Sequence, residues 1–305
     1  MPVTGGSFFR KGASRKLQEL LTIAVLGSAI GVLVAVETVS FAIIFNTTHT
    51  FHVAHAAVMT ISGYLAYAFL DQMDFPIWTG LISSVVIGIA VGVVIDKTLY
   101  KWLRARGASG MIIFMASVGL VTVVEGGVAI IWGPGDLSFS TLPSNAVYVG
   151  SVAVSPANIV MYFGLVLIFA LVVFTVRTRS GRMLRASGDS LEAAQLLGMR
   201  ISVIYALAFA LGSGLVALIG FVIGWYEGLS PSMGLTVVLL AAAGTIIGGR
   251  HGLLPGAIVG FFIGLVQVAV GISIGTAWQD AIVYGLLLVV IVVRPSGLFG
   301  NSLRL

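Results

Sequence analysis

Long apolar stretches dominate this sequence and limit the folds open to it more than any other feature. An α-helix needs about 20 apolar residues to cross the hydrocarbon core of a bilayer, and only helices and closed barrels satisfy their own backbone in lipid. The composition agrees, because 58% of the 305 residues are hydrophobic, 9% are charged, and the mean hydropathy is +1.10. We expect an all-α integral membrane protein, a polytopic helical bundle forming a single domain over residues 1–305. The candidate segments lie near 20–45, 52–70, 76–96, 110–132, 156–176, 202–226, 234–249, 252–275 and 278–293.

The basic residues predict which side of the membrane each connection faces. Lys and Arg concentrate in cytoplasmic loops of membrane proteins. All 16 Lys and Arg residues fall in five places, whereas four other connections contain Asp or Glu and no basic residue. We therefore expect the basic places and the C-terminus on the cytoplasmic side of the membrane. The basic places are 10–16, 97–106, 177–200, Arg250, and Arg294 with Arg304; the acidic connections lie near 71–75, 133–155, 227–233 and 276–280.

The number of crossings is left open between eight and nine. Three apolar segments separate the basic N-terminus from Lys97, which places these two basic regions on opposite sides unless one segment fails to cross. Either the N-terminus is outside and nine segments cross, or an early segment is re-entrant and eight cross. The stretch "NTTHTFHVAHAAVMTISGY" is the best candidate for a discontinuous helix, because its first half is polar and rich in His. The short segment at 234–249 and Pro255 indicate a second broken or tilted region.

Glycine spacing predicts how the helices pack. The chain contains 39 glycines, and a ladder with one glycine every fourth residue runs through Gly256, Gly260 and Gly264. Small residues at this spacing allow helix backbones to approach closely in membranes. We interpret the ladder as a packing surface of the bundle.

Several energy-converting and catalytic sites are excluded by the sequence. No P-loop is present, so this chain does not hydrolyse ATP itself. There is no Cys, no nucleophile elbow of the Gly-x-Ser-x-Gly type, and no carboxylate that completes a metal site with His49, His52 and His55. Glu37 and Glu125 lie inside apolar segments, where each lines a cavity or makes a structural hydrogen bond. The chain is therefore not expected to be an enzyme, and energy, if it is used, comes from a partner or an ion gradient.

The loop at 177–201 contains a polar helical stretch, "SGDSLEAAQLLGM", between apolar segments. Asp189 and Glu192 have the spacing of a capping box at a helix start, and Gly198 suits a helix end. We expect about two turns of helix at the cytoplasmic face of the membrane. Without further information, this stretch is either part of an ordinary charged loop or a rigid element that docks on a cytoplasmic protein.

Several stretches resemble one family of membrane transporters. Glu192, Ala193, Ala194 and Gly198 look like the coupling-loop signature of bacterial ABC-importer permeases. "FHVAHAAVMTISGYLA", "RTRSGRMLRASGDSLEAAQLLGM", "AGTIIGGRHGLLPGAIVGFFIGL" and "RPSGLFG" are similar to elements of LivH-type permeases of branched-chain amino-acid importers, and together they run from about 41 to 300. The sequence departs from this pattern at Ala56, where glycine is usual, and at Glu37, where an uncharged residue is usual.

The resemblance implies a function, a set of partners and a set of site residues. It implies that the chain pairs with a second permease and that two cytoplasmic ATPases, which bind ATP and Mg, dock on the coupling helices. It also implies that a periplasmic substrate-binding protein delivers the solute. No cofactor is expected in this chain. The alternatives are an ABC permease for urea or short amides, and an ion-coupled secondary transporter or channel. The resemblance implies a location in the bacterial inner membrane. It also implies coupling to the ATPase through Asp189, Glu192, Ala193, Ala194, Leu197 and Gly198, and a translocation path beside His55, Ser62, Gly63 and Tyr64. Glu37, an ionisable residue inside an apolar segment, is expected to line the same path.

Overall fold

The computed structural model describes residues 5–249, 253–294 and 297–299, with side chains described from residue 16 onward. Within these residues, seven helical stretches are long and apolar enough to cross a membrane. One shorter apolar helix, α11 (Met233–Gly248), lies at the predicted segment 234–249. The predicted segment 52–70 contains a further short helix, α2 (His55–Tyr67). The predicted fold class, an all-α polytopic membrane protein, is confirmed. The long stretches are Lys16–Thr48, Ile77–Ala105, Gly110–Trp132, Pro156–Arg177, Ile201–Tyr226, Leu253–Ser273 and Thr276–Val293.

The helices depart from the predicted segments in length and continuity. The first, α1 (Gly5–Thr48), has 44 residues and is therefore about 66 Å long, more than a bilayer requires. Three of the long spans, Ile77–Ala105, Pro156–Arg177 and Thr276–Val293, are each built from two or more consecutive helical elements. The remaining elements are η1 (Ala68–Gln72), α3 (Ile77–Ile95), η2 (Asp96–Tyr100), α4 (Lys101–Ala105), α5 (Gly110–Trp132), α6 (Pro156–Met161), α7 (Phe163–Arg177), α8 (Arg179–Asp189), α9 (Leu191–Leu196), α10 (Ile201–Tyr226), α12 (Leu253–Ser273), η3 (Thr276–Trp278) and α13 (Gln279–Val293).

A small β-hairpin lies in the long acidic connection, where no strand was predicted from the sequence. Its strands, β1 (Val147–Val149) and β2 (Val152–Val154), pair antiparallel around the turn at Gly150, whose φ is +65°. Asp71 anchors the same connection by accepting hydrogen bonds from the backbone N–H groups of Ser140 and Thr141. The connection is thus an ordered structure over one end of the bundle.

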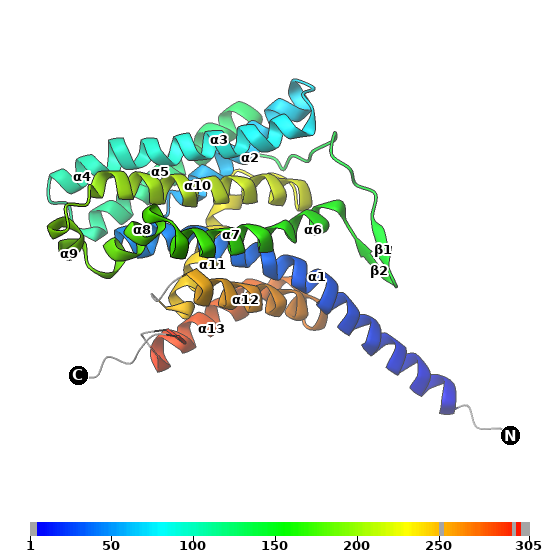
Figure 1. The fold of residues 1–305 in the computed structure, drawn as a ribbon. Coiled ribbons are helices and arrows are strands. Elements are labelled where there is room, and N and C mark those ends of the chain that lie inside the picture. Colours follow the sequence, from blue (N-terminus) through cyan, green and yellow to red (C-terminus); the bar gives the residue numbers. More distant parts are fainter. Residues whose placement is uncertain (1–4, 250–252, 295–296, 300–305) are drawn as a thin grey trace.

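The bundle is arranged around α10, the most buried of the long spans, which contacts α1, α2, α3, α6 and α8. Figure 1 shows α4, α8 and α9 gathered at one end of the bundle and the β-hairpin at the other. In Figure 1 the start of α1 lies toward the hairpin end, whereas the end of α13 lies toward the α8 end. Opposite ends for the first and last helices require an odd number of crossings, which agrees with nine crossings rather than eight.

The predicted discontinuous helix is present between α1 and α2. Helix α1 ends at Thr48, and His49 adopts a left-handed φ of +51°. Residues 49–54 are not helical, yet most of them are buried, and α2 starts at His55, whose side chain is 0% exposed. The chain therefore breaks and restarts its helix inside the bundle. Non-helical backbone at this depth is tolerated only where protein buries it.

The glycine ladder packs α12 against α1, as predicted. A Cβ on Gly264 would lie 2.6 Å from the Cα of Gly31, and a Cβ on Gly260 would lie 2.8 Å from the carbonyl oxygen of Val34. The two backbones thus approach too closely for any side chain at these positions. Figure 1 shows the two helices crossing along this line.

We expect Gly264→Leu to destabilise the isolated chain by at least about 1–3 kcal/mol, the usual cost of overpacking, because Leu has no space between α12 and α1. The matched control is Gly285→Leu on α13, where a Cβ meets no atom within 4 Å. Thermal unfolding of the detergent-purified variants tests this. A Gly264→Leu protein as stable as the control would contradict the packing.

Candidate functional site

Helices α8 and α9 form the end of the bundle where the sequence places the coupling loop. Thr178 caps α8, because its side-chain oxygen accepts a 3.0 Å hydrogen bond from the backbone N–H of Gly181. Ser190 caps α9 in the same way, accepting a 3.2 Å bond from Ala193. The prediction that Asp189 caps the coupling helix is wrong: Asp189 is the last residue of α8. Ser190 is the extended residue between the two helices, with φ −156° and ψ 111°, so only its side chain is placed to cap α9.

The predicted helix end at Gly198 is correct. Its φ is +74°, its backbone N–H donates to Gln195, and the next N–H, of Met199, donates to Ala194. This pair of hydrogen bonds is the Schellman arrangement, which satisfies the last carbonyl groups of a helix and favours glycine at the left-handed position. Gly198 is therefore needed for its backbone conformation, since a Cβ there would meet no neighbouring atom.

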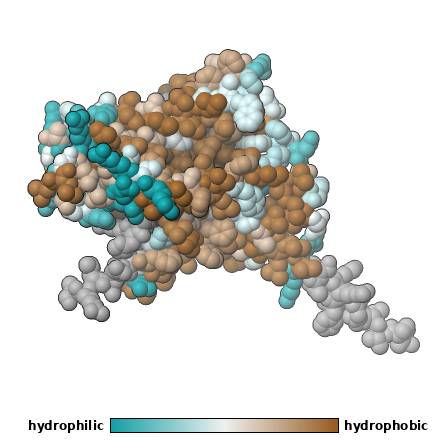
Figure 2. Space-filling model, viewed as in Figure 1, coloured by the Kyte–Doolittle hydropathy of each residue, from teal (hydrophilic) through white to brown (hydrophobic). Residues whose placement is uncertain are grey.

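Two apolar side chains at the C-terminal end of α9 are unusually accessible. Leu196 and Leu197 are 89% and 74% exposed, the first being more exposed than any other large hydrophobic residue described. Five of the six predicted coupling residues also lie on the surface, whereas Ala194 is buried and packs inward. Leu196 was not among the residues predicted from the sequence, although its position beside Leu197 at the end of the helix was a usable signal. Figure 2 shows a hydrophobic projection at the position of α9.

A groove with an arginine rim lies between α8, α9 and the start of α10. Its volume is about 640 Å³, and Met183, Met199 and Val203 contribute apolar lining. Arg179, Arg182 and Arg200 also line it, and none of them forms an ion pair with a residue that the structure describes. Figure 2 shows a band of hydrophilic side chains across this end of the molecule. The surface thus combines an apolar projection, an apolar groove and unpaired positive charge.

Helix α8 rests directly on the last turns of α1. A Cβ on Gly188 would lie 2.5 Å from the carbonyl oxygen of Asn46, and Ser187 beside it is fully buried. Such a close approach leaves no room for α8 to move without displacing α1. Because Asn46 is two residues before the end of α1, this contact lies next to the break between α1 and α2.

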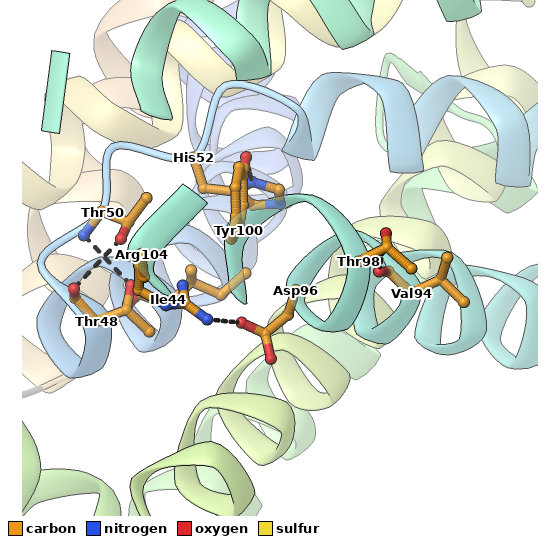
Figure 3. Close-up of polar contacts among 9 residues, drawn as sticks. All are labelled: Ile44, Thr48, Thr50, His52, Val94, Asp96, Thr98, Tyr100 and Arg104. Carbon is orange, nitrogen blue, oxygen red and sulfur yellow. Dashed lines mark hydrogen bonds and ion pairs between the residues drawn. The ribbon is translucent and has the colours of Figure 1, made fainter. Parts of the chain in front are cut away.

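The π-helical turn η2 also contacts the non-helical segment between α1 and α2 (Figure 3). The Nδ1 atom of His52 lies 2.7 Å from the hydroxyl oxygen of Tyr100, and both side chains are fully buried. The His52 ring also packs edge-on against Phe209 of α10, with ring centroids 4.9 Å apart. An ion pair between Arg104 and Asp96 braces the same turn, so that η2 forms a fixed support for the segment before α2.

The five predicted path residues do not converge on one surface. His55 lies where α2 meets α1, with its Nε2 3.0 Å from the hydroxyl oxygen of Ser40, which is one helical turn after Glu37. Ser62 and Tyr64 are fully buried, Ser62 near Gly88 of α3 and Tyr64 against Trp132 of α5. Gly63 faces the chain that leads into α11, because a Cβ there would lie 2.9 Å from Leu229. Helix α2 is therefore surrounded by other helices, and its polar residues point to different neighbours.

Four supporting residues were not singled out from the sequence: Ser40, Asp96, Tyr100 and Arg104. Asp96 and Arg104 stand eight residues apart, a spacing that brings them together only because a π-helical turn intervenes. Ser40 and Tyr100 contact the histidines through the tertiary fold alone, so the sequence carried no local signal for them.

Comparison with known proteins identifies the family. Residues 20–292 match the family described as the permease component of the branched-chain amino acid transport system. The chain belongs to this family. It is 26% identical to BraD, a high-affinity branched-chain amino acid transport system permease protein of Pseudomonas aeruginosa, over 93% of this chain and 96% of the relative. It is 24% identical to LivH of Escherichia coli K12, also a high-affinity branched-chain amino acid transport system permease protein, over 93% of this chain and 96% of the relative.

Two further similarities are more distant. The chain is 27% identical to LsrC of Salmonella paratyphi B, an autoinducer 2 import system permease protein, over 69% of this chain and 61% of the relative. A chain of PsaBC from Streptococcus pneumoniae, solved in complex with a Fab, superposes with a TM-score of 0.53 at 14% identity, covering 96% of this chain and 98% of that chain. The latter similarity is one of fold alone.

We expect Tyr100→Phe to destabilise the protein by about 1–3 kcal/mol, because it removes the hydroxyl partner of the buried His52 ring. The matched control is Tyr64→Phe, since Tyr64 is also fully buried but its hydroxyl has no hydrogen-bond partner among the described residues. Chemical unfolding in detergent compares the two. Equal effects of both substitutions would show that the His52–Tyr100 bond contributes nothing.

Ser190→Ala should loosen α9, because loss of a helix N-cap costs about 1 kcal/mol. Asp189→Ala should have a smaller effect, since Asp189 ends α8 and does not cap α9. Hydrogen exchange of the backbone amides at 191–194 measures this difference. Faster exchange in the Asp189 variant than in the Ser190 variant would show that Asp189 is the cap after all.

Proposed function

We propose that this chain is the transmembrane permease subunit of a bacterial ABC importer that moves branched-chain amino acids or similar small polar solutes inward. Its family membership over residues 20–292 is the observation that carries the proposal. The names of BraD and LivH, which align with nearly the whole chain, support the substrate class. Reconstituted uptake of labelled branched-chain amino acids, compared with urea and short amides, tests it.

In this proposal, separate ATPase subunits supply the energy and α9 receives it. The sequence has no P-loop, so nucleotide must bind elsewhere. Helix α9 offers a short element with fixed ends and two exposed leucines, which suits insertion into a groove of a cytoplasmic partner. Asp189, Glu192, Ala193, Leu197 and Gly198 are the proposed coupling residues, with Leu196 added and Ala194 acting as an inward anchor.

Movement of α9 would reach the interior through α8 and α1. Helix α8 connects directly to α9 and packs on Asn46 without intervening side-chain atoms. The next residues after α1 are the buried break, whose His52 is held by Tyr100. A displacement of α8 would therefore shift the break and the start of α2, and the bundle would alternate between outward-open and inward-open states.

The remaining parts of the importer follow from the same proposal. We propose a second permease subunit, two cytoplasmic ATPases that bind ATP and Mg, and a periplasmic binding protein that delivers the solute. The chain would lie in the inner membrane with its C-terminus and residues 177–201 in the cytoplasm, as the basic residues indicate. Its residues 1–305 would form one permease domain.

Replacing Leu196 and Leu197 together with Ser should prevent the ATPases from binding while leaving the bundle folded. Both side chains are mostly exposed, so the fold loses no packing, whereas a docked partner loses about 1.5–3 kcal/mol for each leucine. This corresponds to well over tenfold weaker binding. Co-purification of the ATPases and ATP-dependent uptake in proteoliposomes measure the loss.

The control is Leu17→Ser, because Leu17 is 60% exposed near the opposite end of the molecule. This variant should bind the ATPases normally. Uptake that continues in wild-type vesicles without ATP or ATPase subunits would exclude an ABC importer in favour of a secondary transporter or channel.

A further inference from the structure

A buried carboxyl group without a partner lies in the membrane-spanning part of α1. The Glu37 side chain is 3% exposed and makes no hydrogen bond or ion pair with any residue that the structure describes. Burying a carboxylate without a partner is costly, and ionisable groups inside membrane proteins usually mark a substrate or ion path. The sequence supplies no Lys or Arg between Lys16 and Lys97 or between Arg200 and Arg250. Helices α2, α3, α10 and α11 therefore bring no cation of their own to Glu37.

Next to Glu37, the hydrogen bonds of Ser40 determine which nitrogen of His55 carries the proton. The Ser40 hydroxyl donates its single hydrogen to the carbonyl oxygen of Glu37 at 2.7 Å. Its oxygen must then accept the 3.0 Å hydrogen bond from Nε2 of His55. In the neutral ring this leaves Nδ1 as an acceptor. The Nδ1 atom is fully buried and has no hydrogen-bond partner in the described part of the chain.

Helix periodicity relates Glu37 to the residues of α1 that contact His55. Residues three and four apart lie on the same face of a helix, with Cβ atoms about 5–6 Å apart. Ser40 and Phe41, on the face of Glu37, both contact His55, the first by the hydrogen bond and the second with ring centroids 6.1 Å apart. Phe41 also belongs to an apolar cluster with Ala56 of α2 and Val238 of α11. Glu37 and His55 therefore place two acceptors without donors beside an apolar surface.

We propose that Glu37 and His55 bind the ammonium group of the transported amino acid, with Phe41 and its apolar neighbours beside the aliphatic side chain. This inference rests on the proposed function and adds the residues that recognise the solute. An ammonium group supplies three N–H donors and a positive charge, which matches one carboxylate and one imidazole acceptor. The carboxyl group of Glu227, close enough to Glu37 to interact electrostatically, adds negative potential of the same sign.

The experiment uses the complete importer complex in lipid nanodiscs, without the binding protein, so that binding reports on the membrane subunits. Binding of labelled leucine is measured in competition with unlabelled leucine and with 2-hydroxy-4-methylpentanoate, in which a hydroxyl replaces the ammonium group. Glu37→Gln should weaken leucine binding about tenfold or more, the expected loss for a charged hydrogen bond. The hydroxy acid should bind wild type and Glu37→Gln equally, because it lacks the group that Glu37 recognises.

The matched control is Glu125→Gln, which removes a carboxyl group from the membrane-spanning α5 and should leave leucine binding unchanged. If the Glu37→Gln complex does not assemble, Glu37→Asp is used in the same binding experiment. Its shorter side chain keeps the carboxyl group but moves it away from the ammonium group. Selective weakening of leucine binding in Glu37→Asp supports the proposal.

Leucine binding at wild-type affinity in the Glu37 variants, or equal loss of leucine and hydroxy-acid binding, would overturn the role of Glu37. That result, obtained while the wild-type complex still takes up leucine, would leave the proposed function intact. A wild-type complex that transports no branched-chain amino acid would instead overturn the substrate of the proposed function.

Discussion

The structure depends on the buried break between α1 and α2, because a chain inside a membrane cannot leave its backbone groups without partners. The break meets part of this requirement locally. The backbone N–H of His49 still donates to Phe45, that of Thr50 donates to the Thr48 side chain, and that of His55 donates back to His52. The two histidines then fix the segment to its neighbours, His52 to η2 and His55 to α1. The irregular segment and the start of α2 are thus joined to η2 and to α1 by one side-chain hydrogen bond each.

The position of the break explains why α8 packs where it does. If α1 continued as an uninterrupted helix, a push from α8 on Asn46 would move α1 as a rigid rod. With the helix interrupted three residues later, the same push acts on a short segment held by a few hydrogen bonds. Hinges in proteins are commonly such short segments at element ends. The close contact at Gly188 and the irregular segment after Thr48 together give the loop a route into the interior.

The sequence predicted most of the fold and only part of the candidate site. Hydropathy located all nine apolar elements, and the Gly256–Gly264 ladder was correctly assigned to packing, because both signals are local and repeated. The break was also predicted, since a polar, His-rich stretch inside an apolar run is unfavourable in a continuous membrane-spanning helix. Partners of the histidines were not predictable, because Tyr100 contacts His52 from 48 residues away. The cap was misassigned by one residue: Asp189 and Ser190 are both good cap formers, and only the backbone conformation separates them.

The unpaired polar atoms around α2 bear on how such a bundle can change state. Besides His55, the hydroxyl groups of Ser62 and Tyr64 on α2, and of Ser213 on α10, are buried without hydrogen-bond partners in the described residues. Each such group costs about 1–3 kcal/mol relative to a paired one. The close contacts between α3 and α10 stabilise the present arrangement, because Gly88 and Gly92 let α3 pack tightly against Ser213 of α10. A second arrangement that paired the polar atoms of α2 would recover this cost, whereas separating α3 from α10 would lose packing. Two states of similar free energy are what the proposed alternation between outward-open and inward-open states requires.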